Sequence, residues 1–352
     1  MRIKSSIRDY ELKIIENFKE YLEDVYNKGD YIIIDEKVFN LFQNQFESEI
    51  WKSRLIKIKA EEETKSYLKI ANIIETLIDS GFKKNNTLIA IGGGITQDTT
   101  AFIASILYRG VDWVFFPTTL LAQGDSCIGS KTSINFGKYK NQIGNFYSPR
   151  EIYIDLKFLK TLDERDIVSG LGEIAHYFLV ASEEDFQRFK RDYPIVRQDD
   201  EVLKKLLLRS LEIKKSYIEI DEFDKKERQV FNYGHSFGHA IESLTNYEIP
   251  HGVAVSIGMD IANYMSVKYG YMKKEKREEI REVLRQIWKG YTLENINLFD
   301  MESALRKDKK NKGNLLGLIL SRGPGKTFKE YKELDVYFSS WLKDYFELEF
   351  KK

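Results

Sequence analysis

The first half of the chain alternates short apolar runs with stretches of helical periodicity. Two of these stretches, 62–82 and 99–110, repeat apolar residues every three to four positions, and the first ends at a glycine. Alternating strands and helices favour a parallel sheet with helices on both faces. The runs typical of buried strands are 31–35 (YIIID), 87–94 (TLIAIGGG), 113–117 (WVFFP) and 151–155 (EIYID).

Strand signals mostly disappear after about residue 160, with LLGLILS (315–321) as the main exception. We therefore expect an α/β domain over 1–160 and a mainly α-helical domain over 161–352. The five prolines form no proline-rich linker. The helical periodicity covers 166–181, 201–220, 252–270 and 276–290.

Composition narrows the class of protein. The 352 residues include 55 Lys+Arg and 55 Asp+Glu, and zero net charge argues against non-specific nucleic-acid binding. Cys127 is the single cysteine, so no intrachain disulfide can form. The N-terminus has no apolar core of signal-peptide length, and no run of about 18 apolar residues occurs. We expect a soluble, cytoplasmic protein that binds neither nucleic acid nor membrane.

Two glycine-rich stretches are candidates for ligand binding. IAIGGGITQD (89–98) places three glycines between a strand and a helix, where backbone N–H groups can approach a pyrophosphate. It lacks the GxGxxG pattern, so a simple tight turn remains an alternative. Residues 115–149 form a polar stretch that is long for a plain connection. Asp125, Lys131, Lys140 and Asn141 could hold an anionic, hydroxylated ligand, although a solvated loop is the alternative.

Three of the four histidines fall within 17 positions: His235, His239 and His251. His235 and His239, four residues apart, share a helical face. Glu173 lies three residues before the fourth, His176. One carboxylate and two imidazoles with an open position describe a catalytic zinc site. Local spacing leaves open which two histidines take part.

Several longer motifs follow one another along the chain: GGGITQD, YRGVDWVFFPTTLLAQGDS, GKYKNQIGNFYSPREIYID, LKTLDERDIVSGLGE, NYGHSFGHAIE and HGVAVSIGM. They resemble, in the same order, motifs of 3-dehydroquinate synthase and the related sugar-phosphate cyclases. The resemblance runs from about residue 30 to 320 and implies a homodimer that binds NAD in the first domain and one divalent metal, zinc or cobalt, in the second.

The resemblance also assigns residues. Glu173, His235 and His251 match the metal ligands, and His239 would instead face the substrate phosphate. The cofactor positions are Asp35, Glu62 and Lys65 at the adenosine end, Gly93, Gly94, Ile95 and Asp98 at the pyrophosphate, and Thr118, Thr119, Asp125, Lys131, Lys140 and Thr161. The catalytic positions are Asp125, Lys131, Asn141, His176, Lys214, Arg228, Asn232, His239, Lys309, Lys310 and Arg109, the last reaching a neighbouring subunit.

The implied reaction oxidises a ring hydroxyl transiently with NAD, eliminates phosphate, returns the hydride and closes a carbocycle by aldol addition. The simplest substrate is a seven-carbon keto-acid sugar phosphate, whose carboxylate suits Arg228. His176 stands where the family usually has lysine, and Gln97 stands where a small residue is usual. Alternatives are a cyclase for another sugar phosphate in specialised metabolism, a metal- and NAD-dependent polyol dehydrogenase of the same fold, and a non-catalytic binding protein.

Overall fold

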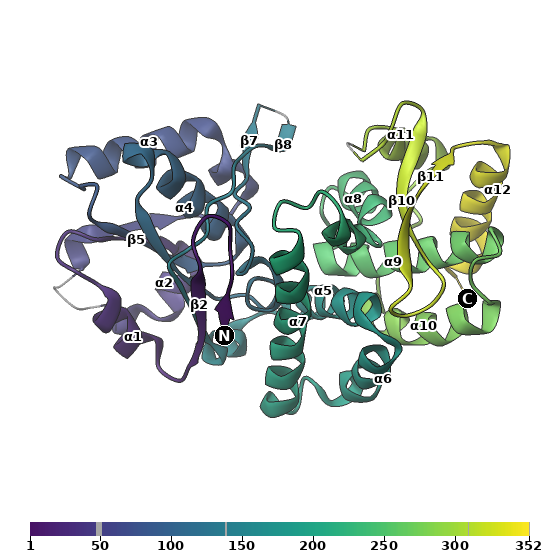
Figure 1. Cartoon of the computed structure of the whole chain (residues 1–352), viewed down its shortest axis with the longest axis horizontal. Coiled ribbons are helices and arrows are strands. Elements are labelled where there is room, and N and C mark those ends of the chain that lie inside the picture. The colour runs from purple at the N-terminus through teal and green to yellow at the C-terminus, as the bar shows by residue number, and fades with distance from the viewer. Residues whose placement is uncertain (47–50, 138, 309, 352) are drawn as a thin grey trace. The chain divides into compact units, whose positions relative to one another are not determined.

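The computed structural model describes residues 1–46, 51–137, 139–308 and 310–351. These residues form two compact units, shown by their elements in Figure 1. The α/β unit comprises Met1–Asp163 with Lys214–Phe223, and the helical unit comprises Glu164–Ile213 with Asp224–Lys352.

A seven-stranded sheet organises the α/β unit. All its strand pairs are parallel except β1–β2, so the expected parallel sheet is confirmed. All six residues of β5 are buried, which explains its continuous apolar sequence. The strand order is β1 (Arg2–Ile3), β2 (Tyr10–Ile15), β9 (Glu151–Asp155), β6 (Asp112–Pro117), β5 (Thr87–Gly92), β3 (Tyr31–Asp35) and β4 (Leu55–Ile58).

Two helices of this unit do not begin where the periodicity indicated: α3 (Tyr67–Asp79) begins later and α4 (Gly94–Ile106) begins earlier. The stretch 62–82 begins as a 3-10 turn, Glu62–Lys65, and becomes α3 only at Tyr67–Asp79. The helix α4 starts at Gly94, directly after the glycine turn, and ends at Ile106, where a 3-10 turn with left-handed Tyr108 and Arg109 follows. The remaining helices are α1 (Phe18–Val25) and α2 (Glu36–Leu41).

The stretch 115–149 has regular structure that its composition concealed. It holds a π-helical turn, Ala122–Ser126, and a two-stranded hairpin of β7 (Ile134–Phe136) and β8 (Tyr139–Ile143). β7 is only three residues long, with two of them buried, and β8 is mostly polar. Neither strand therefore has the apolar run that would predict it.

The helical unit is built around α9 (His251–Lys268), which packs against α5 (Glu164–Ala181), α8 (His235–Leu244), α10 (Lys274–Ile287) and β10 (Leu315–Ser321). All its residues from Gly252 to Ser266 are buried, as expected of a helix surrounded by others. The strand-like run at 315–321 is β10, and its partner β11 (Thr327–Glu333) was missed because TFKEYKE is polar. The other helices are α6 (Glu183–Asp192), α11 (Leu298–Arg306), α12 (Val336–Asp344) and the first part of α7 (Asp200–Ile220), whose residues from Lys214 onward belong to the α/β unit.

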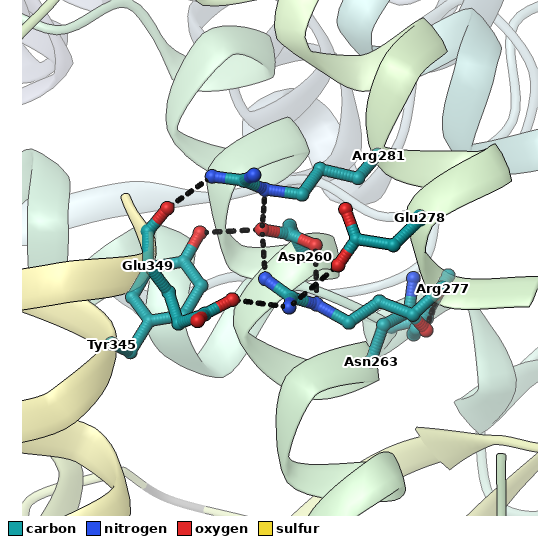
Figure 2. A network of polar contacts seen from close by, with 8 residues as sticks. Asp260, Asn263, Arg277, Glu278, Arg281, Tyr345 and Glu349 are labelled. Carbon is teal, nitrogen blue, oxygen red and sulfur yellow. Dashed lines mark hydrogen bonds and ion pairs between the residues drawn. The ribbon is translucent and has the colours of Figure 1, made fainter. Parts of the chain in front are cut away.

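A buried charge network fixes α9 to α10 and to the C-terminal segment (Figure 2). Asp260 of α9 has no exposed surface and accepts hydrogen bonds from Arg277 at 3.0 and 3.1 Å and from Arg281 at 3.1 Å. The Tyr345 hydroxyl donates to the same carboxylate at 2.9 Å, and Arg277 also pairs with Glu349 at 2.8 Å. Because every charge in this network has a partner, α9 is held in one position.

Within the described ranges, every helix is too short or too polar to cross a bilayer.

Candidate functional site

Two glycines bring α5 and α9 into backbone contact. A Cβ on Gly252 would lie 1.8 Å from the Ser169 carbonyl oxygen, and a Cβ on Gly172 would lie 2.2 Å from the Gly252 carbonyl oxygen. Only glycine permits this approach. Glu173 follows Gly172 and His251 precedes Gly252, so the crossing brings these two side chains together.

Glu173, His235 and His251 form one donor group, with ligand atoms all within 4.8 Å of one another. Nε2 of His235 lies 3.7 Å from Oε1 of Glu173, and Nε2 of His251 lies 3.6 Å from Oε2. The pKa of His235 is lowered well below its usual value, first by burial and then by the neighbouring histidines, so its imidazole is neutral. A carboxylate and two imidazoles fit zinc or cobalt.

A second donor group consists of His239, Glu242 and His251. His251 belongs to both groups, because its Nδ1 lies 3.0 Å from Oε2 of Glu242. No such group among the described residues contains His235 and His239 together, although the two share a face of α8. The His239 side chain is exposed at the surface, and the protein atoms packed around it, followed by His251, lower its pKa.

His176 lies beside the first group, not within it. Its side chain is fully buried on α5, with Nδ1 3.6 Å from Oε1 of Glu173. The rings of Tyr177, Phe231 and His235 surround it at 5.0, 5.7 and 5.1 Å between centroids.

The other expected residues of the helical unit show mixed arrangements. Arg228 is buried in the 3-10 turn Glu227–Asn232, and the Asn232 amide donates to Gln229 of the same turn at 3.1 Å. Lys310 pairs with Asp308 at 2.7 Å. Lys309 lies outside the described residues.

In the α/β unit, the glycine turn joins β5 to α4. Gly93 is the N-cap of α4, and no side chain caps the N-terminal N–H groups of the helix. A Cβ on Gly93 would meet the Thr119 side chain at 3.0 Å, whereas a Cβ on Gly94 would meet nothing within 4 Å. Ile95 follows in the first turn of α4. This surface is open and suited to an anion.

Further expected cofactor residues lie near the carboxyl ends of strands. Thr118, directly after β6, donates its backbone N–H to the Gly92 carbonyl at 3.0 Å. Asp35 ends β3 and caps α2, and burial raises its pKa. Ligands of open parallel sheets bind outside the carboxyl ends of the strands. Thr161 lies at the end of a 3-10 turn, where its hydroxyl donates to the Phe158 carbonyl at 2.9 Å.

A polar cluster connects the 3-10 turn, α4 and the β7–β8 hairpin. The Lys65 ammonium lies 2.6 Å from Oδ2 of Asp98 and donates to Oδ1 of Asn141 at 2.8 Å. Burial raises the pKa of Asp98, and Lys65 opposes that rise. Asn135, which sequence reasoning missed, accepts from the Asn141 backbone N–H at 2.9 Å and donates to Glu62 at 2.8 Å.

Lys140 completes that cluster, since its ammonium lies 3.7 Å from Oε2 of Glu62. Elsewhere in the α/β unit, Lys214 donates to both the carbonyl and the carboxylate of Asp125 at 2.7 Å. Lys131 forms a β-bridge with Phe146. Arg109 is exposed, with a left-handed φ of 65°.

The unusual Gln97 has a clear local function. Its amide donates to the Ser126 carbonyl at 2.6 Å and accepts from the Ser126 hydroxyl at 2.6 Å. These two bonds join α4 to the π-helical turn that carries Asp125. The glutamine therefore stabilises the structure beside the glycine turn.

The fold and the two sites define a class: α/β proteins with an attached helical unit that carries a glutamate–histidine–histidine donor group. The family model for the 3-dehydroquinate synthase N-terminal region matches residues 55–169, and the C-terminal model matches 170–311. The 3-dehydroquinate synthase of Alkaliphilus metalliredigens is 35% identical over 299 residues, 84% of each chain. That of Campylobacter concisus is 40% identical over 268 residues, 76% of each chain. The chain belongs to the 3-dehydroquinate synthase family, which confirms the resemblance.

Solved structures share the fold. One is 2-deoxy-scyllo-inosose synthase complexed with carbaglucose-6-phosphate, NAD+ and Co2+, with a TM-score of 0.82, 22% identity and 98% coverage of each chain. Another is 2-epi-5-epi-valiolone synthase from Streptomyces hygroscopicus subsp. jinggangensis with NAD+ and Zn2+, with a TM-score of 0.85, 24% identity and coverage of 95% of this chain and 96% of the other.

Proposed function

We propose that the protein is a sugar-phosphate cyclase of the 3-dehydroquinate synthase type, dependent on NAD and one divalent metal. The observation that carries the proposal is the donor group of Glu173, His235 and His251 in a member of this family. The proposed organisation is an NAD-binding domain over 1–160 and a metal- and substrate-binding domain over 161–352. Two solved structures of the same fold, which contain NAD+ with Co2+ or Zn2+, support the choice of cofactors.

In this proposal Glu173, His235 and His251 hold zinc or cobalt. Bound there, the metal would act as a Lewis acid that polarises the substrate hydroxyl to be oxidised. The protein contributes the donor set of one carboxylate and two imidazoles, and burial disfavours protonation of the His235 imidazole. His235 has its Nδ1 3.2 Å from the Tyr233 carbonyl, so an Nδ1–H donor leaves Nε2 available as a ligand.

The glycine turn and the N-terminus of α4 are proposed to hold the NAD pyrophosphate. Bound there, NAD would supply a hydride acceptor that is restored within the same turnover, so no net redox change would remain. The open N–H groups of α4 complement phosphate charge, and Gly93 leaves no side chain above them. Asp35, near the carboxyl end of β3, is the proposed ribose acceptor.

Arg228, His239 and Lys310 are the proposed anion-binding residues of the helical unit. Arg228 offers a planar, permanently charged fork for a carboxylate. Lys310 offers an ammonium for phosphate, and its partner Asp308 orients it. Departure of phosphate is favoured where such donors meet the developing negative charge. The exposed Arg109 is the proposed contact to a second subunit in a homodimer.

The test is turnover on a panel of sugar phosphates that includes a seven-carbon keto-acid phosphate and hexose 6-phosphates. Phosphate release and NADH absorbance are followed in the same reaction with catalytic NAD. We expect phosphate to form in step with product while NADH does not accumulate. NADH formed one-for-one with product would move the protein to the polyol dehydrogenases. That alternative has some support, since a glycerol dehydrogenase from Schizosaccharomyces pombe shares the fold with a TM-score of 0.59, at 16% identity over 85% of this chain and 82% of the other.

A further inference from the structure

The His251 imidazole lies between two carboxylates. Its Nε2 lies 3.6 Å from Oε2 of Glu173, and its Nδ1 lies 3.0 Å from Oε2 of Glu242. The residue therefore belongs to two possible metal groups, one with Glu173 and His235 and one with His239 and Glu242. An ion bound by Nε2 and an ion bound by Nδ1 would occupy different places.

The two separations distinguish these possibilities. Two donor atoms that each lie about 2.1 Å from one tetrahedral ion are about 3.4 Å apart. The 3.6 and 3.7 Å separations around Glu173 are close to that value and too long for hydrogen bonds. The 3.0 Å separation between Nδ1 and Glu242 is shorter and matches a hydrogen bond.

The chemistry of the pair fixes the position of the proton. An ionised carboxylate can only accept, so the Nδ1 of His251 must donate to Glu242. When the imidazole carries only this proton, its lone pair is on Nε2, which faces Glu173. His235 has the same arrangement, with Nδ1 3.2 Å from the Tyr233 carbonyl and Nε2 toward Glu173. Both imidazoles thus present Nε2 to the Glu173 carboxylate, His235 to Oε1 and His251 to Oε2.

We propose that Glu242 is a positioning residue for the metal site, and not a metal ligand. It lies in the last turns of α8, where it holds His251, the first residue of α9, in one tautomer and orientation. The inference rests on the proposed metal-binding function of Glu173, His235 and His251. Partners of this kind change metal affinity about 10–100-fold.

The first test compares wild type with Glu242→Ala, Glu242→Gln and the control Glu248→Gln. Glu248 is exposed and lies three residues before His251, so its substitution removes the same charge without touching the pair. Zinc affinity is measured by competition with a chromophoric chelator, and folding is checked by thermal unfolding. We expect Glu242→Ala to bind zinc about tenfold or more weakly. Glu242→Gln should lose less, because its amide oxygen still accepts, and the control should match wild type.

The second test reads the tautomer directly. Nitrogen NMR of protein labelled only at histidine resolves four side chains, which single substitutions assign. In zinc-loaded wild type, His251 should carry a proton on Nδ1 and bind through Nε2. Wild-type affinity in Glu242→Ala overturns the proposal, as does zinc bound to Nδ1 or a second zinc equivalent lost in that variant.

The metal-free protein separates this proposal from the proposed function. His251 should favour the Nδ1–H tautomer without metal, and Glu242→Ala should remove that preference. If wild type binds no zinc but shows this pattern, the proposed function fails while the pairing of Glu242 with His251 stands. If wild type binds zinc but the tautomer of His251 is the same in Glu242→Ala, the positioning role of Glu242 is wrong while the proposed function stands.

Discussion

The Lys65 ammonium lies 2.6 Å from the Asp98 carboxylate, and only 6% of the lysine side chain is exposed. The same ammonium donates to Asn141, whose backbone has a left-handed φ of 53°. One cation therefore fixes the position of α4 relative to the β7–β8 hairpin. A charge removed from water in this way is costly unless its partner stays in place.

Lys65→Met should lower the thermal unfolding midpoint and reduce the further rise that NAD produces. It leaves the Asp98 carboxylate in a partly buried place without its cation, which costs up to about 3 kcal/mol. Asp98→Asn should act similarly. The double variant should lose less than the sum, because the two residues form one unit.

Lys69→Met is the matched control, since Lys69 is exposed on α3. Its loss should leave the unfolding midpoint unchanged both without NAD and with NAD. Additive losses in the double variant would show that Lys65 and Asp98 act independently.

Gly252→Ala should destabilise the helical unit and weaken zinc binding together. The new methyl group would lie 1.8 Å from the Ser169 carbonyl oxygen, so α5 and α9 must separate. Overpacking of this kind costs about 1–3 kcal/mol. Because Glu173 and His251 are adjacent to the crossing, the separation moves two proposed ligands apart. Calorimetry and chelator competition measure both effects.

Gly94→Ala is the control for the substitution itself, because a methyl group there meets nothing within 4 Å. It should leave zinc affinity unchanged. If Gly252→Ala is destabilised but binds zinc as tightly as wild type, the contact between α5 and α9 does not determine the position of the proposed ligands.

The sequence predicted what depends on local pattern. β5 and β6 were recognisable because both lie inside the sheet and are apolar throughout. β2 and β4 were missed because they mix charged and apolar residues, as in YELKII and LIKI. The pairing of Lys65 with Asn141 joins residues 76 positions apart, so no periodicity could indicate it.

The donor group shows the same limit. Local spacing left open which two histidines take part, and only the resemblance assigned His251; the group around Glu173 takes His251 from the next helix. The contact between α5 and α9 decides this, and a tertiary contact has no local signature. Glu242 had a usable signal, since it lies three residues after His239 on one helix.

Acid should weaken the contact between α10 and α6 through Glu279. Hydrogen bonding to Lys276 chiefly lowers the Glu279 pKa from 4.5 to about 2, and Gln187 and Lys190 of α6 contribute. Because the folded pKa is depressed, this carboxylate stabilises the fold fully above about pH 4.5 and loses the effect as pH falls toward 2. Glu279→Gln should therefore lower the unfolding midpoint at pH 7, by an amount that shrinks below pH 4.5.

Glu282→Gln, at an exposed position away from the first turn of the same helix, is the control and should follow wild type at every pH. A difference between Glu279→Gln and wild type that stays constant down to pH 3 would contradict the linkage.

His251→Ala should abolish metal retention, whereas His239→Ala should keep the metal and weaken binding of the phosphate group. The expectation follows from the donor group with Glu173, which includes His251 and not His239. Metal content after dialysis and inhibition by inorganic phosphate measure the two properties. Loss of metal from His239→Ala with retention in His251→Ala would reverse the assignment.

His176→Lys tests whether this position selects the substrate. The resemblance implies a lysine at this position, whereas His176 is fully buried beside Glu173 and enclosed by aromatic rings. A lysine would add a fixed charge where a histidine can be neutral and can also accept a hydrogen bond.

If the native substrate is the keto-acid phosphate, His176→Lys should retain or raise kcat/KM. If the enzyme uses another sugar phosphate, the substitution should damage that reaction and improve the keto-acid one. His176→Gln, which keeps a polar side chain without charge, separates charge from shape. Identical specificity profiles for wild type and His176→Lys would show that this residue does not determine the substrate.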